Sequence, residues 1–159
     1  MNNDSKEKNT LIAIGIACSE KERRWSIDNY IELVKYLLKK NYNNFLIISG
    51  KNQTNEEENI KEKLNNNNAN FIFTSKKKIS DVIPDILKCK FYVGNDTGFA
   101  HLFVNYGINS YIIYGDCVPQ YYSKSINIID KDEDIERSDN SINTITLDKV
   151  IESLQLNLA

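Results

Sequence analysis

Short apolar runs alternate with helix-like segments along this chain, and this alternation restricts the possible folds more than any other feature. Six runs indicate buried strands, the last of them weakly: residues 11–17, 45–49, 71–73, 91–93, 111–114 and 126–129. Helical patterns lie between or after them: residues 26–38, 54–64, 81–88, 96–106 and 147–156. Strands separated by helices pair in parallel through right-handed crossovers. The sequence therefore predicts an α/β domain with a single Rossmann-like, doubly wound parallel sheet.

Capping residues mark the expected helix ends. Ser26 precedes an apolar stripe at helical spacing and is the expected N-cap of the first helix. Thr54 and Glu57 match a capping box for the second helix. Pro84 is expected in the first turn of its helix, because a missing N–H costs least there. Gly107 is expected just beyond the C-terminus of the helix that precedes it.

The length and composition fit one domain. A chain of 159 residues with 41% hydrophobic side chains can bury one sizeable core, but not those of two full α/β domains. Residues 1–10 are polar and charged, and we expect them to be a mobile tail or the remnant of a linker. Residues 11–159 are expected to form this folded domain. An acidic segment at residues 130–139 is expected to be an exposed loop.

Charge and cysteine content exclude several classes of function. The 20 basic and 22 acidic side chains produce no field that would gather nucleic acid. No apolar run approaches the roughly 18 residues that a membrane span needs, so no transmembrane segment is expected. Three cysteines without a CxxC pair suit a reduced compartment better than a disulfide or zinc scaffold. The cytoplasm is the expected location, with peripheral attachment to the inner face of the membrane as an option.

The stretch from Phe91 to His101 carries the best candidate site. Gly94, Asn95 and Asp96 break the preceding strand, so a helix is expected to begin at Asp96 or Thr97. The free N–H groups at its start favour an anion, and Gly98 has no Cβ to keep a phosphate away. We expect Asp96 to cap this helix or to accept a hydrogen bond from a ligand hydroxyl. An ordinary strand-to-helix turn is the alternative interpretation.

Other loops should meet this one. Ligands of doubly wound sheets bind beyond the carboxyl ends of the strands, where the loops after the first, second, third, fourth and fifth strands all lie. Arg23, Arg24 and His101 could therefore converge on one anion, with Arg23 favoured over Arg24. A solvated pair of arginines and a surface histidine are the alternatives. No spacing matches the glycine-rich fingerprints of dinucleotide-binding or P-loop proteins, which disfavours dehydrogenases and NTPases.

Three motifs together resemble the carboxyl-terminal half of glycosyltransferase family 9, the ADP-heptose lipopolysaccharide heptosyltransferases and their relatives. They are Arg23-Arg24-Trp25, Ser49-Gly50 and the block from Gly94 to His101, of which Asp-Thr-Gly-x-x-His is the most specific. The resemblance covers residues 11–122. It implies a GT-B fold, in which two Rossmann-like domains face each other and the carboxyl-terminal one holds the nucleotide-sugar donor.

The resemblance also implies roles for individual residues. Thr97 and Gly98 would hold the donor diphosphate with His101 beside it, and Arg23 stands where the family has the lysine of a Lys-x-Trp motif. The site expected from it is therefore Arg23, Asp96, Thr97, Gly98 and His101, with no residue assigned to catalysis. It implies no cofactor and no metal, because the ADP-sugar is a substrate. One acidic residue among residues 56–58 would lie near the nucleoside, although the residues themselves indicate a solvated helix start.

Four positions depart from the family pattern and leave the donor's identity open. Arg23 replaces lysine, Ser26 and Phe99 replace proline, and Ser49 replaces glycine. Thr74 and Ser75 are weak candidates for the base pocket. In the family an amino-terminal domain carries the acceptor site, and nothing before residue 11 matches one, so we expect a donor half alone.

The leading hypothesis is thus the donor-binding domain of a glycosyltransferase that moves heptose or a related sugar from an ADP-sugar to a lipopolysaccharide-type acceptor. Without an amino-terminal acceptor domain it is expected to be inactive. The alternative is a non-catalytic module that binds a nucleotide or nucleotide sugar. A flavodoxin-like signalling domain is a third interpretation, but Cys18-Ser19 stands where it would need acidic residues.

Overall fold

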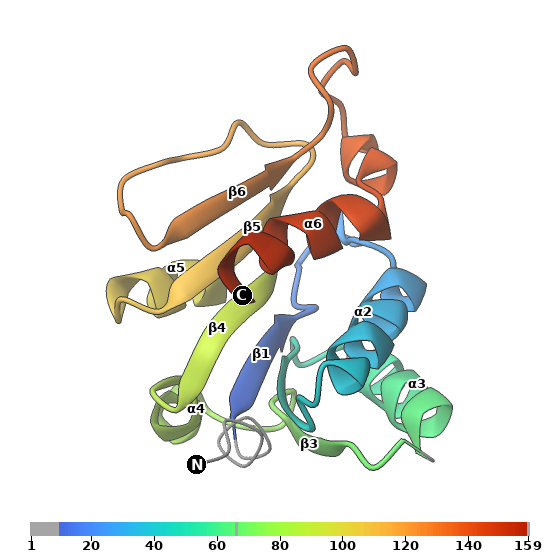
Figure 1. Ribbon diagram of the computed structural model, residues 1–159, viewed down its shortest axis with the longest axis vertical. Coiled ribbons are helices and arrows are strands. Elements are labelled where there is room, and N and C mark those ends of the chain that lie inside the picture. Colours follow the sequence, from blue (N-terminus) through green and yellow to red (C-terminus); the bar gives the residue numbers. More distant parts are fainter. Residues whose placement is uncertain (1–9, 66, 159) are drawn as a thin grey trace.

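A single sheet of six parallel strands organises the chain (Figure 1), whose computed structural model describes residues 10–65 and 67–158. The strands are β1 Leu11–Gly15, β2 Asn44–Ile48, β3 Asn70–Phe73, β4 Cys89–Asn95, β5 Asn109–Tyr114 and β6 Ile126–Asp130. Their order in the sheet is β3-β2-β1-β4-β5-β6. The order reverses between β1 and β4, and this switch point is where ligands of such sheets bind.

Helices cover both faces of the sheet. They are α2 Ile27–Lys39, α3 Thr54–Leu64, α4 Ile79–Ile86, α5 Gly98–Asn105 and α6 Leu147–Leu158, with 3₁₀ turns η1 Lys21–Arg23 and η2 Ser141–Thr144. Side chains of α2, α3 and α6 pack in one apolar cluster, and those of α4 and α5 pack in another. The clusters lie on opposite sides because successive strand residues, such as Ile12 and Ala13, point to opposite faces. The predicted doubly wound sheet is confirmed.

Several expected details are confirmed as well. The weak run at residues 126–129 is strand β6, which pairs with β5 at the edge of the sheet. Ser26 occupies the N-cap position of α2, although its hydroxyl makes no capping hydrogen bond. Gly107 follows α5 with a φ of 72°, a conformation that favours glycine. The mobile tail expected at residues 1–10 lies outside the described residues except for Thr10.

The expectation for Pro84 is wrong. Helix α4 begins at Ile79, so Pro84 is the sixth residue of the helix and not part of its first turn. A proline there leaves the Ser80 carbonyl without its partner from the helix backbone. Ser80 is exposed, so water can take that place, and the helix ends two residues after the proline.

The capping box expected at the start of α3 is also wrong. Thr54 is the first helical residue and Gln53 holds the N-cap position. The Gln53 side chain is buried, where its Oε1 accepts from the Gly50 N–H at 2.7 Å and its Nε2 donates to the Ile16 carbonyl at 3.0 Å. Gln53 thus joins the loops after β1 and β2 through its side chain, and the helix begins at the next residue.

Candidate functional site

A cavity of about 510 Å³ opens at the carboxyl ends of β1, β2, β4 and β5. Its wall is made by loops that are distant in sequence and includes Arg23, Arg24, Asp96, Thr97, Gly98 and Asp116. Four of the five site residues expected from the sequence therefore lie together. His101 is not part of this wall.

The start of α5 forms one side of the cavity. Helix α5 begins at Gly98, with Thr97 at the N-cap position and no side chain capping the helix. A Cβ added to Gly98 would meet nothing within 4 Å, so the space in front of the helix is open. The first backbone N–H groups of a helix have no partner within it and favour an anion. The corner has the geometry of an anion site.

Asp96 does not cap this helix, so that part of the expectation is wrong. Its Oδ1 lies 2.8 Å from Nε2 of His101, one turn into α5. Nδ1 of His101 lies 2.5 Å from the Tyr122 hydroxyl, and the two rings stack with centroids 5.7 Å apart. In the neutral ring, Nε2–H donates to the carboxylate and Nδ1 accepts from the tyrosine. Asp96 and Tyr122 thereby fix the orientation of His101 beside the cavity.

Asn95 determines how the first loop lies against α5, a role that the sequence interpretation missed. Its side chain is 1% exposed. Oδ1 accepts from the Trp25 N–H at 3.0 Å and from the Tyr30 hydroxyl at 2.9 Å. Nδ2 faces the carbonyls of Ile16 at 3.3 Å and Ala17 at 3.4 Å. Asn95 was interpreted only as a strand breaker, whereas it extends β4 and ties that strand to the loop carrying the arginines.

Arg23 points into the cavity, where it meets a carboxylate. Its Nε lies 2.5 Å from Oδ2 of Asp116 and 2.8 Å from Oε2 of Glu20. These two carboxylates, Asp116 first, raise the pKa of Arg23. Arg24 is held by Glu56, whose Oε1 lies 3.0 Å from Nη1, and its Nε donates to the Cys18 carbonyl at 3.1 Å. The expected convergence of both arginines with the helix start is observed, and phosphate contact remains a prediction.

Glu57 is not a solvated residue at the start of a helix. It is 9% exposed and accepts hydrogen bonds from the Ser75 N–H at 3.0 Å, the Ser75 hydroxyl at 2.7 Å and the Ser49 hydroxyl. The Thr74 hydroxyl accepts from the Ser49 N–H at 3.0 Å. Thr74 and Ser75, the weak candidates for a base pocket, therefore hold the ends of β2 and β3 together. Neither lines the cavity.

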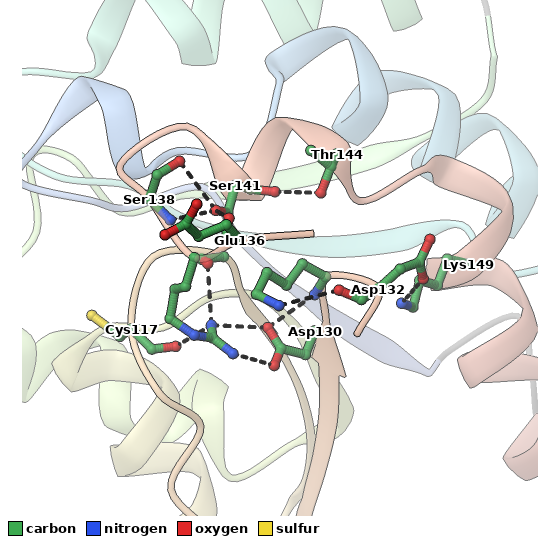
Figure 2. A network of polar contacts seen from close by, with 11 residues as sticks. Cys117, Asp130, Asp132, Glu136, Ser138, Ser141, Thr144 and Lys149 are labelled. Carbon is green, nitrogen blue, oxygen red and sulfur yellow. Dashed lines mark hydrogen bonds and ion pairs between the residues drawn. The ribbon is translucent and has the colours of Figure 1, made fainter. Parts of the chain in front are cut away.

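Arg137 binds the loop that forms the remaining wall of the cavity, between Cys117 and Asp130, which are labelled in Figure 2. Its Nη1 donates to the carbonyls of Gly115 at 3.1 Å and Cys117 at 2.6 Å, on either side of Asp116. The same guanidinium binds both carboxylate oxygens of Asp130, at 3.1 and 2.6 Å, and this hydrogen bonding raises the pKa of Arg137. The acidic segment was expected to be an exposed loop only. The single arginine among residues 130–139 was the available signal that this segment contacts the loop after β5.

A comparison with protein families gives a match to glycosyltransferase family 9 (heptosyltransferase) over residues 2–141. This chain belongs to glycosyltransferase family 9. Comparison with curated proteins gave no match. The family 9 chain contains, within residues 10–65 and 67–158, no helix that combines the length and apolar character needed to cross a membrane.

Solved structures show the same fold at low sequence identity. E. coli heptosyltransferase WaaC with ADP is 19% identical, with a TM-score of 0.75, and 95% of this chain matches 45% of that one. E. coli ADP-heptose lps heptosyltransferase II is 20% identical, with a TM-score of 0.79, over 98% of this chain and 51% of that one. The family 9 glycosyl transferase of Veillonella parvula is 16% identical, with a TM-score of 0.77, over 98% of this chain and 46% of that one. The family 9 chain thus spans about half the length of these relatives.

Proposed function

We propose that this chain is the donor-binding half of a family 9 glycosyltransferase and holds the diphosphate of a nucleotide sugar at the start of α5. The observation that carries the proposal is the open corner at Gly98, which shares one cavity with Arg23 and Arg24. Unpaired helix N–H groups beside guanidinium groups are a common arrangement for binding phosphate. The proposed donor is ADP-heptose or a related ADP-sugar, in line with the ADP bound to E. coli WaaC.

The same groups would serve transfer by stabilising charge. When the bond between the sugar and the diphosphate breaks, negative charge grows on the leaving oxygen, and fixed N–H dipoles and a guanidinium nearby lower the barrier. In this proposal Thr97, Gly98 and Arg23 bind the diphosphate, His101 lies beside it, and Asp96 orients His101. The hydroxyl that attacks belongs to a lipopolysaccharide-type acceptor held by an amino-terminal acceptor domain. We place this function in the cytoplasm, either free or at the inner face of the membrane.

A second candidate is a nucleotide-binding module without transfer activity. It would bind the nucleotide in the same cavity at the start of α5. Both candidates predict nucleotide binding, and only the first predicts transfer once an acceptor domain is supplied. The purified chain alone is expected not to consume ADP-heptose, and turnover by it would contradict the assignment as a donor half.

Isothermal titration calorimetry with ADP tests the site. The wild type is expected to bind with a dissociation constant between about 1 μM and 1 mM, typical of modest ligand sites. Arg23→Ala removes a charge-assisted contact and should weaken binding about tenfold. Gly98→Val fills only open space, so the fold should persist while the phosphate is displaced.

Asn105→Val is the matched control, because Asn105 is exposed at the opposite end of the same helix. It should leave ADP affinity unchanged. Equal affinity in the wild type, Arg23→Ala and Gly98→Val would remove the proposed site. A wild type that binds neither ADP nor an ADP-sugar would remove the proposed function.

A further inference from the structure

Asp116 is one of two carboxylates in the cavity wall; the other, Asp96, lies against His101. The side chain of Asp116 is 11% exposed and meets Arg23 at 2.5 Å. The second partner of Arg23, Glu20, is 56% exposed and lies outside the cavity wall. Arg23 is therefore paired inside the cavity by one carboxylate and outside it by another.

The backbone on both sides of Asp116 is held in place. Arg137 binds the carbonyls of both its neighbours, Gly115 and Cys117, and is itself held by Asp130 (Figure 2). A phosphate that reaches Arg23 must then share the guanidinium with a fixed negative charge. Repulsion between like charges in a partly enclosed site is much stronger than in bulk water.

The ligands that fit the proposed function differ in the charge of their outer phosphate. A free nucleoside diphosphate ends in a phosphate with a single bridging oxygen, to the other phosphate, and this terminal group carries about 1.5 to 2 negative charges at neutral pH. In a nucleotide sugar the same phosphate also forms an ester with the sugar, so it has two bridging oxygens and keeps about one negative charge. We propose that Asp116 sets the charge that the site accepts, so that the nucleotide sugar is favoured over the free nucleoside diphosphate. This inference rests on the proposed function and adds a residue that determines its selectivity.

The test compares Asp116→Asn with the wild type by calorimetry, using ADP and ADP-glucose as probes. Asparagine keeps the shape of the side chain and removes its charge. Asp116→Asn should bind ADP about tenfold more tightly, and ADP-glucose less than threefold more tightly. Asp116→Ser is a second neutral variant, in case the first fails to fold. Glu20→Gln is the matched control, and it should change neither affinity by more than about twofold.

The outcomes separate this inference from the proposed function. A wild type that binds ADP as tightly as both neutral variants keeps the function and overturns the role of Asp116. An equal gain for both ligands, or the same gain in Glu20→Gln, also overturns it. ADP binding that is detectable only in the neutral variants supports it. No binding of either probe by any variant removes the function, and the inference with it.

Discussion

Replacing Asn95 by aspartate tests how the fold holds the first loop against the start of α5. The substitution keeps the shape of the side chain and exchanges the Nδ2 group for a carboxylate oxygen. That oxygen would face the carbonyls of Ile16 and Ala17, which now lie 3.3 and 3.4 Å from Nδ2. At 1% exposure, water cannot solvate the new charge. The loss of two hydrogen bonds, at about 1 kcal/mol each, and the burial of a charge together cost about 3–5 kcal/mol.

The expected loss is about 3–5 kcal/mol of the free energy of unfolding at pH 8, a large part of a typical total of about 5–15 kcal/mol. Burial raises the pKa of the new carboxyl in the folded state above its unfolded value near 4. The folded state therefore binds more protons, and the deficit should grow as pH rises from about 4 through the folded pKa. At pH 5 the protonated carboxyl can donate to one carbonyl, so the loss should be only about 1–2 kcal/mol.

Urea denaturation at pH 5 and pH 8 measures both values. Asn109→Asp is the matched control, since Asn109 is exposed at the first residue of β5, and its effect should stay within about 0.5 kcal/mol. A loss below about 1 kcal/mol in Asn95→Asp at pH 8, or one that does not depend on pH, would refute the reasoning.

Three further predictions follow from the other contacts around the cavity. Arg137→Lys should lower the melting temperature less than Arg137→Ala, because lysine keeps the charge beside Asp130. It should still melt below the wild type, because lysine lacks the planar fork that binds two carbonyls and a carboxylate, and equal melting of the two variants would contradict this. Gly115→Ala should cost more than about 2 kcal/mol in denaturation, because its Cβ would meet the Ile142 backbone at 2.3 Å, whereas Gly98→Ala should be tolerated; the reverse order would contradict the packing. Burial raises the pKa of Cys89 to about 12. Iodoacetamide at pH 8 should therefore label Cys89 after Cys18 and Cys117, the two cysteines of the cavity wall, and peptide mass spectrometry can follow the order. Labelling of Cys89 first would contradict its burial.

The sheet could be predicted from the sequence because each strand is a compact apolar run with a helical pattern after it. The position of the site followed from the same pattern, since loops after parallel strands share one edge. Thr97, Gly98 and Arg23 were expected in this way to lie close together, and they line one cavity; their contact with a phosphate stays a prediction. The sequence is sufficient to predict which loops meet, because the order of strands and helices alone brings these loops to one edge of the sheet.

Long-range contacts account for what was missed. The charged neighbours of Glu57 predict a solvated residue, but Glu57 binds serines from the loops after β2 and β3. Asp96 was expected to cap α5, yet it binds His101, which in turn contacts Tyr122 from a distant loop. Asp116 gave no signal in the sequence, because its partner Arg23 lies about ninety positions away.

The central claim is that a nucleotide's diphosphate rests against the first N–H groups of α5. The most direct test is an amide chemical-shift titration of the ¹⁵N-labelled chain with ADP. The account predicts the largest shifts at Gly98, Phe99 and Ala100, saturating together, with small shifts at Asn105 on the far end of the helix. Saturable shifts gathered elsewhere, with these three amides unmoved, would contradict it.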